Sequence, residues 1–127
     1  MFKQDQLSKW NIVCGALNMA LAIMLGAMLA HYLETVISPR QMQTFETGNR
    51  YHMIHSIAFF LLGLLQIHFQ LKIKSLFIIL WLGISLFSVN CYLYALTGIK
   101  LFAMLVPLGG LSYIIFWLLL SWKMLKR

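Results

Sequence analysis

A small set of polar and ionisable side chains lies within the apolar runs of this sequence or at their ends. If the runs cross a membrane, these side chains lie at similar depths in it. The set comprises His31, Arg50, Tyr51, His55, Ser88 and Asn90. Tyr51 and His55 are four residues apart, which places both on one face of a helix. Inside a membrane, such residues either hydrogen-bond between helices or mark a functional site. The set is interpreted as interhelical packing or, alternatively, as a ligand site, whereas His52 and His68 are expected to face the interface or the headgroups.

A ligand site at this depth would suit a lipid, a quinone or a haem. A haem needs two axial ligands from facing helices, and His31 with His55 is the best pair, because their depths differ by only a few ångströms. Nothing else in the sequence supports haem, so no cofactor is expected. Copper(I) is another alternative, since Met19, Met24 and Met28 lie near His31 and thioethers suit soft ions. Methionine is equally a common apolar filler.

His55 is expected to be buried between helices and hydrogen-bonded. At about 1.5 Å per helical residue, it lies roughly 7 Å deeper than Arg50. Lipid offers no partner to an imidazole at that depth, and an unpaired ring would cost free energy. Tyr51 on the same helix, with Ser88 or Asn90 from the next apolar run, is the expected set of partners.

Patterns typical of catalytic sites are absent from the sequence. The three acids, Asp5, Glu34 and Glu46, lie outside the apolar runs, whereas proton-coupled carriers usually place a carboxylate inside the membrane. There is no Gly-rich phosphate loop, no paired-cysteine metal motif and no Gly-x-Ser-x-Gly turn. We therefore expect a non-enzyme without catalytic residues or a metal site. Glu46 and Arg50 are four residues apart, a spacing that favours an ion pair on a helix surface.

Four long apolar runs must position these side chains. Of the 127 residues, 61% are apolar and 10% are charged, against about 25% charged in an ordinary soluble domain. Residues 10–33, 51–71, 75–99 and 101–122 contain no Asp, Glu, Lys or Arg, and a bilayer-crossing helix needs about 20 residues. Because lipid tolerates no unpaired backbone groups, each run is predicted to be helical. The prediction is an all-α membrane protein with one domain, 1–127, and helices at about 10–33, 43–70, 75–97 and 101–123.

Short connections predict an antiparallel four-helix bundle. Ser38-Pro39 favours a break after the first helix, and Gly98 is expected to cap the third. The N-terminus, the second loop and the C-terminus then share one side, which carries Lys3, Lys9, Lys72, Lys74, Lys123, Lys126 and Arg127. The other side carries Arg40, Arg50 and Lys100. This bias predicts that both termini are cytoplasmic, and it is read as orientation and lipid contact, not as nucleic-acid binding.

Small residues indicate where helices pack closely. Asn18, Ala22, Gly26 and Ala30 recur every four residues in the first run, and small side chains let helix backbones approach each other. Pro107 is expected to bend the last helix. Gly109 and Gly110 leave room beside it for a neighbouring helix or a ligand.

Four segments, taken in order, are similar to motifs of one family. Leu25–His31 looks like Gly-Ala-x-Gly-Ala-His, and Thr47–His55 looks like Thr-Gly-x-x-Tyr-x-x-x-His. Phe87–Leu93 is similar to a Phe-Ser-Gly-Ser-x-Tyr-x run, and the matching Ala95–Gly98 comes directly after it. Pro107–Trp117 resembles a closing Pro-x-Gly-Gly with a later Trp.

The sequence thus resembles the family catalogued as domain of unknown function 423, which includes eukaryotic transmembrane protein 256. The resemblance covers nearly the whole chain and implies a small four-helix protein of the bacterial inner membrane, or of an organelle membrane, without an established activity. Leu29 and Val89 stand where the family has glycine, and Asn90 stands where it has serine. The added bulk implies that a pocket shared by the family would be partly filled here.

The expected function is that of a non-enzymatic accessory subunit of a larger membrane complex, or of a homo-oligomer, acting through helix–helix contacts. The alternative is a small-molecule site in the outer leaflet, for a lipid, quinone or haem, built around His31 and His55. The expected location is the bacterial inner (plasma) membrane, or an organelle membrane in a eukaryote.

Overall fold

Four helical spans make up almost all of the computed structural model, which describes residues 2–127 and the side chains from Gln6 onward. The side chains of Lys3 and Asp5 lie outside the described residues. In chain order the elements are α1 (Phe2–His31), η1 (Leu33–Thr35), α2 (Pro39–Phe69), α3 (Lys74–Gly83), η2 (Ile84–Ser88), α4 (Val89–Thr97) and α5 (Lys100–Leu125). Since α3, η2 and α4 form one continuous span, four segments are long and apolar enough to cross a bilayer. No strand occurs in residues 2–127, so the predicted all-α, four-helix class is confirmed.

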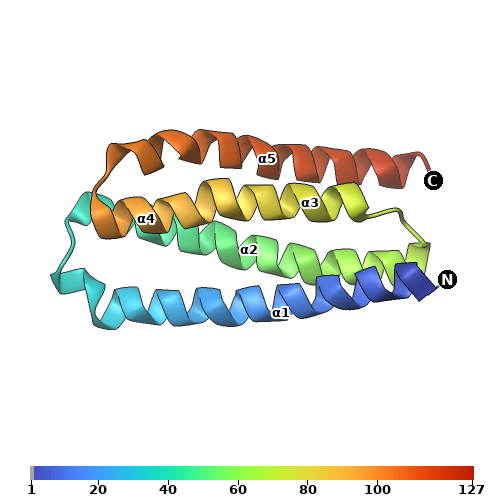
Figure 1. Ribbon diagram of the computed structural model, residues 1–127, viewed down its shortest axis with the longest axis horizontal. Helices are drawn as coiled ribbons and strands as arrows, with labels where there is room; N and C mark the ends of the chain where they lie inside the picture. The colour runs from blue at the N-terminus through green and yellow to red at the C-terminus, as the bar shows by residue number, and fades with distance from the viewer. Residues whose placement is uncertain (1) are drawn as a thin grey trace.

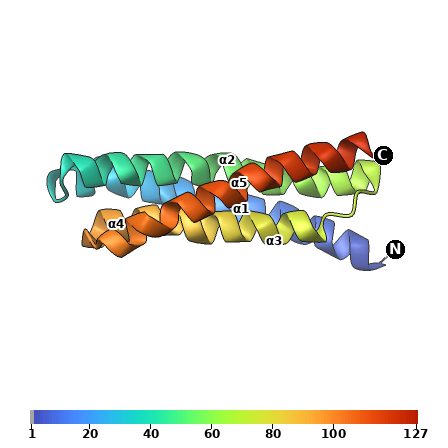
Figure 2. The ribbon, with the colours of Figure 1, turned by 90° about the horizontal axis from the view of Figure 1, so that it is seen from above.

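Consecutive spans run antiparallel (Figure 1). Both chain termini and the α2–α3 connection lie at one end of the bundle, named here the terminal end. The η1 segment and the α4–α5 turn lie at the opposite end, named the η1 end. Helix α1 packs mainly on α2, whereas α5 packs on α3, η2 and α4. Figure 2 shows α5 running obliquely across the other helices.

Local capping explains where α2 begins and where α4 ends. The Ser38 hydroxyl accepts from the Gln41 backbone N–H at 3.2 Å, and the Ser38 N–H donates to the Gln41 side chain at 2.9 Å. This capping box starts α2 at Pro39, earlier than the expected residue 43. Gly98 adopts the predicted left-handed cap, with φ 70°. Helix α1 also begins earlier than expected, at Phe2 instead of residue 10.

Helix α2 is longer than a bilayer requires. Its 31 residues extend about 46 Å, whereas the hydrocarbon core is about 30 Å thick. When the apolar run 51–71 occupies the hydrocarbon, residues 39–50 extend into the headgroup region at the η1 end. The polar first third of α2 is therefore placed where lipid headgroups lie.

The third span contains a π-helical turn, η2, that the sequence pattern does not predict. The wider turn shifts the backbone hydrogen-bond pattern, which frees carbonyl groups to accept from side chains. The Asn90 side-chain amide donates to the Ser85 carbonyl at 3.1 Å and to the Leu86 carbonyl at 2.9 Å. Gly109 of α5 lies directly against this turn, because a Cβ atom there would overlap the backbone of Leu86 and Phe87. The sequence predicts that Gly109 leaves room for a neighbouring helix or for a ligand, and in the structure the neighbouring helix fills that room.

Only part of the predicted small-residue stripe faces a neighbouring helix. Asn18 and Ala22 are buried, and a Cβ atom on Gly26 would lie 2.9 Å from the Asn49 side-chain oxygen. Ala30 is exposed, so its assignment to the packing face is wrong. The four-residue repeat drifts around the helix, and Leu29 takes the buried position instead.

Two apolar clusters form the core, one toward each end. The cluster toward the η1 end consists of Leu29, Leu33, Phe45, Tyr92 and Ala95. The larger cluster consists of Ala58, Phe59, Leu62, Leu71, Ile73, Leu76, Leu80, Ile84, Tyr113, Phe116 and Leu120. On α2, the residues between these clusters include both buried histidines. Pro107 lies inside α5 and is exposed.

Candidate functional site

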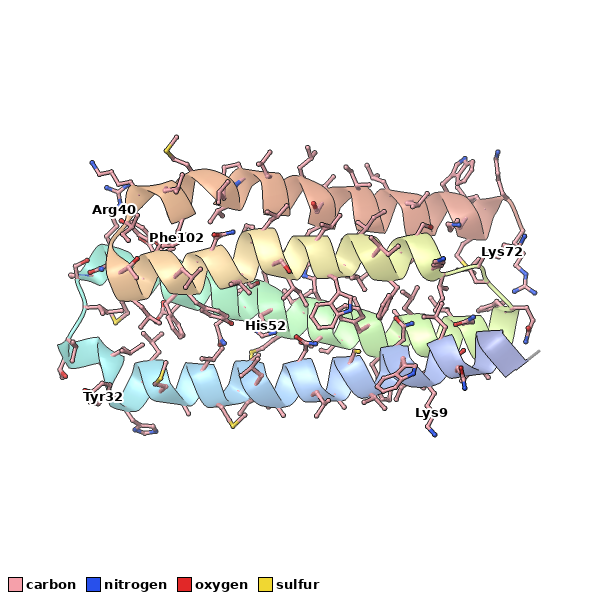
Figure 3. All side chains as sticks on the ribbon, viewed as in Figure 1. Lys9, Tyr32, Arg40, His52, Lys72 and Phe102 are labelled. Carbon is pink, nitrogen blue, oxygen red and sulfur yellow. The ribbon has the colours of Figure 1, made fainter. Side chains whose placement is uncertain are left out.

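The polar side chains in the bundle form two separate networks, not one cluster. The first is centred on His52, which is 2% exposed and lies near the middle of the bundle (Figure 3). Its Nε2 atom lies 3.0 Å from the Asn18 side-chain oxygen on α1. Its Nδ1 atom lies 2.9 Å from the Tyr92 hydroxyl on α4. His52 therefore ties three helices together, and the expectation that it faces the headgroups is wrong.

The surrounding hydrogen bonds assign the proton of His52. The Asn18 amide nitrogen donates to the Cys14 carbonyl at 2.9 Å, so the Asn18 oxygen is the acceptor from His52 Nε2–H. Asn49 donates to the Tyr92 oxygen at 3.1 Å and to the Ala22 carbonyl at 2.7 Å. The Tyr92 O–H then donates to the unprotonated Nδ1 of His52. Each ring nitrogen of a neutral His52 has a partner.

The second network is centred on His55, which is also 2% exposed. The Trp117 indole N–H on α5 donates to His55 Nε2 at 3.1 Å. His55 Nδ1 lies 2.7 Å from the Tyr51 backbone carbonyl. The imidazole stacks on the Tyr113 ring, with centroids 3.5 Å apart, and the Tyr113 hydroxyl lies 3.1 Å from the Ser88 hydroxyl. The prediction that His55 is buried and hydrogen-bonded is confirmed.

The expected partners of His55 are only partly correct. Tyr51 contributes its carbonyl group, and its half-exposed ring lies parallel to the imidazole at 6.2 Å between centroids. Asn90 is bonded to η2, and Ser88 reaches His55 only through Tyr113. The true side-chain partner comes from α5, which depth along the helices does not reveal.

His31 and Arg50 belong to neither network. His31 is exposed at the end of α1, so the structure does not bring it together with His55. Both ring nitrogens of His55 are engaged, so an iron atom at Nε2 would have to displace Trp117. The described side chains contain no group of three or more His, Cys, Asp or Glu residues that could hold a metal ion.

A groove of about 640 Å³ lies between α1 and α2 at the η1 end. Charged and polar side chains on its wall are Glu34, Glu46, Asn49 and Arg50. Its apolar and small residues are Gly26, Leu29, Ala30, Met42 and Met53. The expected ion pair between Glu46 and Arg50 is not formed among the described side chains, so all three charged groups are open to a ligand.

Several network residues were missed from the sequence: Asn49, Tyr92, Tyr113 and Trp117. The spacing of Tyr113 and Trp117 could have revealed two of them. These residues are four apart and share one face of α5, as Tyr51 and His55 share one face of α2. Chemically, both networks satisfy their own donors and acceptors across helices. This arrangement favours the packing interpretation for His52 and His55.

Comparisons with known proteins agree with this architecture. A model of the family described as "Protein of unknown function (DUF423)" matches residues 25–110. The chain is 38% identical over 112 residues to the UPF0382 membrane protein YwdK of Bacillus subtilis (strain 168), which covers 86% of this chain and 90% of that protein. It is 34% identical over 115 residues to a UPF0382 membrane protein of Staphylococcus epidermidis (strain ATCC 12228 / FDA PCI 1200), which covers 91% of this chain and 94% of that protein. No solved structure matches the chain. The four bilayer-length helices and the named relatives together make this chain an all-α membrane protein that belongs to the DUF423 family.

Proposed function

We propose that the protein is a non-enzymatic membrane component that associates with a second copy of itself through α1. The observation that carries this proposal is the outward face of α1, where Ala16, Ala20 and Ala27 are exposed. At about 100° per residue, these alanines fall within about 40° of one another, on the side opposite the buried Asn18 and Ala22. Small residues in a membrane helix allow the close approach of another helix.

The contrast with α5 supports this choice of helix. Both α1 and α5 lie at the edge of the bundle and bury less of their surface than the inner spans. The outward side chains of α5 are large, and they include Leu108, Leu111, Ile114 and Leu118. Large aliphatic side chains suit contact with lipid. On α1 the exposed alanines alternate with the larger exposed Ile23 and Met24, and such a face of small and large side chains can be self-complementary when two copies of α1 cross about a two-fold axis.

The oligomeric state in nanodiscs tests this proposal. We expect a dimer for the unaltered protein and a monomer for the Ala20→Leu/Ala27→Leu variant, whose large side chains hold the two helices apart. Leu21→Met is the control, because Leu21 is exposed and lies about 100° around α1 from Ala20, and this variant keeps the dimer. A monomeric unaltered protein overturns self-association, and a dimer that survives both alanine substitutions overturns the assignment of the interface to this face of α1. Capture from native membranes then tests the accessory-subunit alternative, in which a different membrane protein covers the same alanines.

The second candidate function is binding of an amphipathic small molecule at the η1 end, and the groove between α1 and α2 favours it. This candidate keeps the small-molecule alternative but moves it from His31 and His55 to the charged wall of the groove. A spectrum of protein purified in mild detergent tests the haem form: a Soret band that His55→Leu abolishes would restore His55 as a ligand. Binding of labelled lipid to the purified protein tests the lipid form, with Arg50→Gln as the variant that weakens it.

A further inference from the structure

The groove between α1 and α2 combines charges of both signs with an apolar wall. We propose that it binds an aminophospholipid, with the lipid phosphate on Arg50 and the lipid ammonium between Glu34 and Glu46. This inference rests on the second candidate function and names the ligand class for the same groove. Three features of the groove support it: its charges, their order along α2 and the apolar residues below them.

The charge of the groove departs from the charge of the whole chain. The chain has ten Lys and Arg residues and only three acids. Two of those acids, Glu34 and Glu46, line the groove, and Arg50 is the basic residue that lines it with them. All three side chains are exposed, and no ion pair joins them within the described part of the chain. A strongly basic protein thus presents a local site that is complementary to a ligand carrying both an anion and a cation.

The order of these charges along the membrane normal matches one kind of lipid. Arg50 lies four residues, about 6 Å, further toward the bundle centre than Glu46. Glu34 belongs to η1, at the end of the bundle. In an aminophospholipid the acyl chains are deepest, the phosphate comes next and the ammonium is outermost. Arginine suits phosphate oxygens, and a carboxylate suits an ammonium group.

The wall below Arg50 suits an acyl chain. Met53 lies about one turn deeper on α2, and Gly26 and Leu29 line the facing side on α1. Gly26 has no side chain to narrow the groove, and the flexible thioether of Met53 adapts to an apolar ligand. A groove that is charged at its outer part and apolar at its inner part fits an amphipathic lipid.

Native mass spectrometry of delipidated protein, titrated with defined lipids, tests this inference. The probes are phosphatidylethanolamine and phosphatidylglycerol with identical acyl chains. We expect the unaltered protein to bind phosphatidylethanolamine about tenfold more tightly, since one charge-assisted contact accounts for roughly that factor. Glu34→Gln/Glu46→Gln should abolish the preference for phosphatidylethanolamine. Arg50→Gln should lower the affinity for both lipids about tenfold. Lys100→Gln, at the same end but outside the groove, should change neither affinity.

The outcomes separate the ligand class from the lipid function. Equal or tighter binding of phosphatidylglycerol, lost in Arg50→Gln, overturns the aminophospholipid inference and leaves lipid binding in place. Unchanged lipid affinities in Arg50→Gln overturn both the aminophospholipid inference and lipid binding in this groove, because the bound lipid then lies elsewhere. The side chains of Glu34, Glu46 and Arg50 are exposed and make no hydrogen bond within the described part of the chain, and a thermal unfolding curve for each variant verifies that it is folded.

Discussion

The indole N–H of Trp117 donates to Nε2 of His55 at 3.1 Å and thereby joins α5 to α2. Because Nε2 accepts this bond, the imidazole proton lies on Nδ1, which donates to the Tyr51 carbonyl. His52, one turn earlier, carries its proton on Nε2 instead, since Nδ1 accepts from Tyr92. Two neutral histidines of opposite tautomer thus tie α2 to its neighbours on two sides.

Replacing Trp117 should loosen the contact between α5 and α2. Trp117→Phe keeps an aromatic ring but removes the donor to His55, which leaves a buried nitrogen without its partner. We expect a loss of about 1 kcal/mol in unfolding free energy, in the range of interhelical hydrogen bonds in membranes. Unfolding of the detergent-solubilised protein by a denaturing detergent measures it. Trp122→Phe, at the exposed end of α5, is the control, and an equal loss there would contradict a specific role for the indole N–H.

The two histidines expected at the interface should behave differently when replaced. His52→Leu removes the partner of both the Asn18 oxygen and the Tyr92 hydroxyl, so we expect a loss of about 1–2 kcal/mol in unfolding free energy. His68 is exposed at the terminal end, and His68→Leu should change that free energy by less than about 0.5 kcal/mol. The same detergent unfolding assay compares them. Equal effects would show that the His52 hydrogen bonds contribute nothing to stability.

Run lengths and breakers predict the fold, but the partners inside it depend on three-dimensional approach. The apolar runs locate four helices because lipid forces the backbone to pair within each run. Depth counting places His55 at the right level but cannot give the rotation of the neighbouring helices, so it misses Trp117 and Tyr113. The π turn at η2 rotates α4 about its axis, and with it Asn90 and Tyr92. Residues 75–97 contain no proline that would signal that turn.

Gly109 and Gly110 should differ sharply in their tolerance of alanine. A Cβ atom on Gly109 would overlap the backbone of η2, whereas one on Gly110 would lie 3.6 Å from the Phe87 ring, at ordinary contact distance. Gly109→Ala is expected to cost about 1–3 kcal/mol, as overpacking does. Gly110→Ala should be neutral or stabilising by up to about 1 kcal/mol, because alanine favours helix. Thermal unfolding of the pair is the measurement, and a tolerant Gly109 would contradict the close approach of α5 to η2.

Both chain termini should be cytoplasmic, because the basic residues are distributed unequally between the two ends of the bundle. Figure 3 shows Lys9 and Lys72 at the terminal end and Arg40 at the η1 end. Seven Lys and Arg residues lie at or near the terminal end and three toward the η1 end, and the side richer in these residues stays in the cytoplasm.

A phosphatase that folds only outside the cytoplasm reports this orientation when it is fused after Arg127, where it should be inactive. The same reporter fused after Gly98, in the α4–α5 turn, should be active and serves as the positive control. The reverse pattern would invert the bundle, and the groove that holds Glu34, Glu46 and Arg50 would then open to the cytoplasmic leaflet.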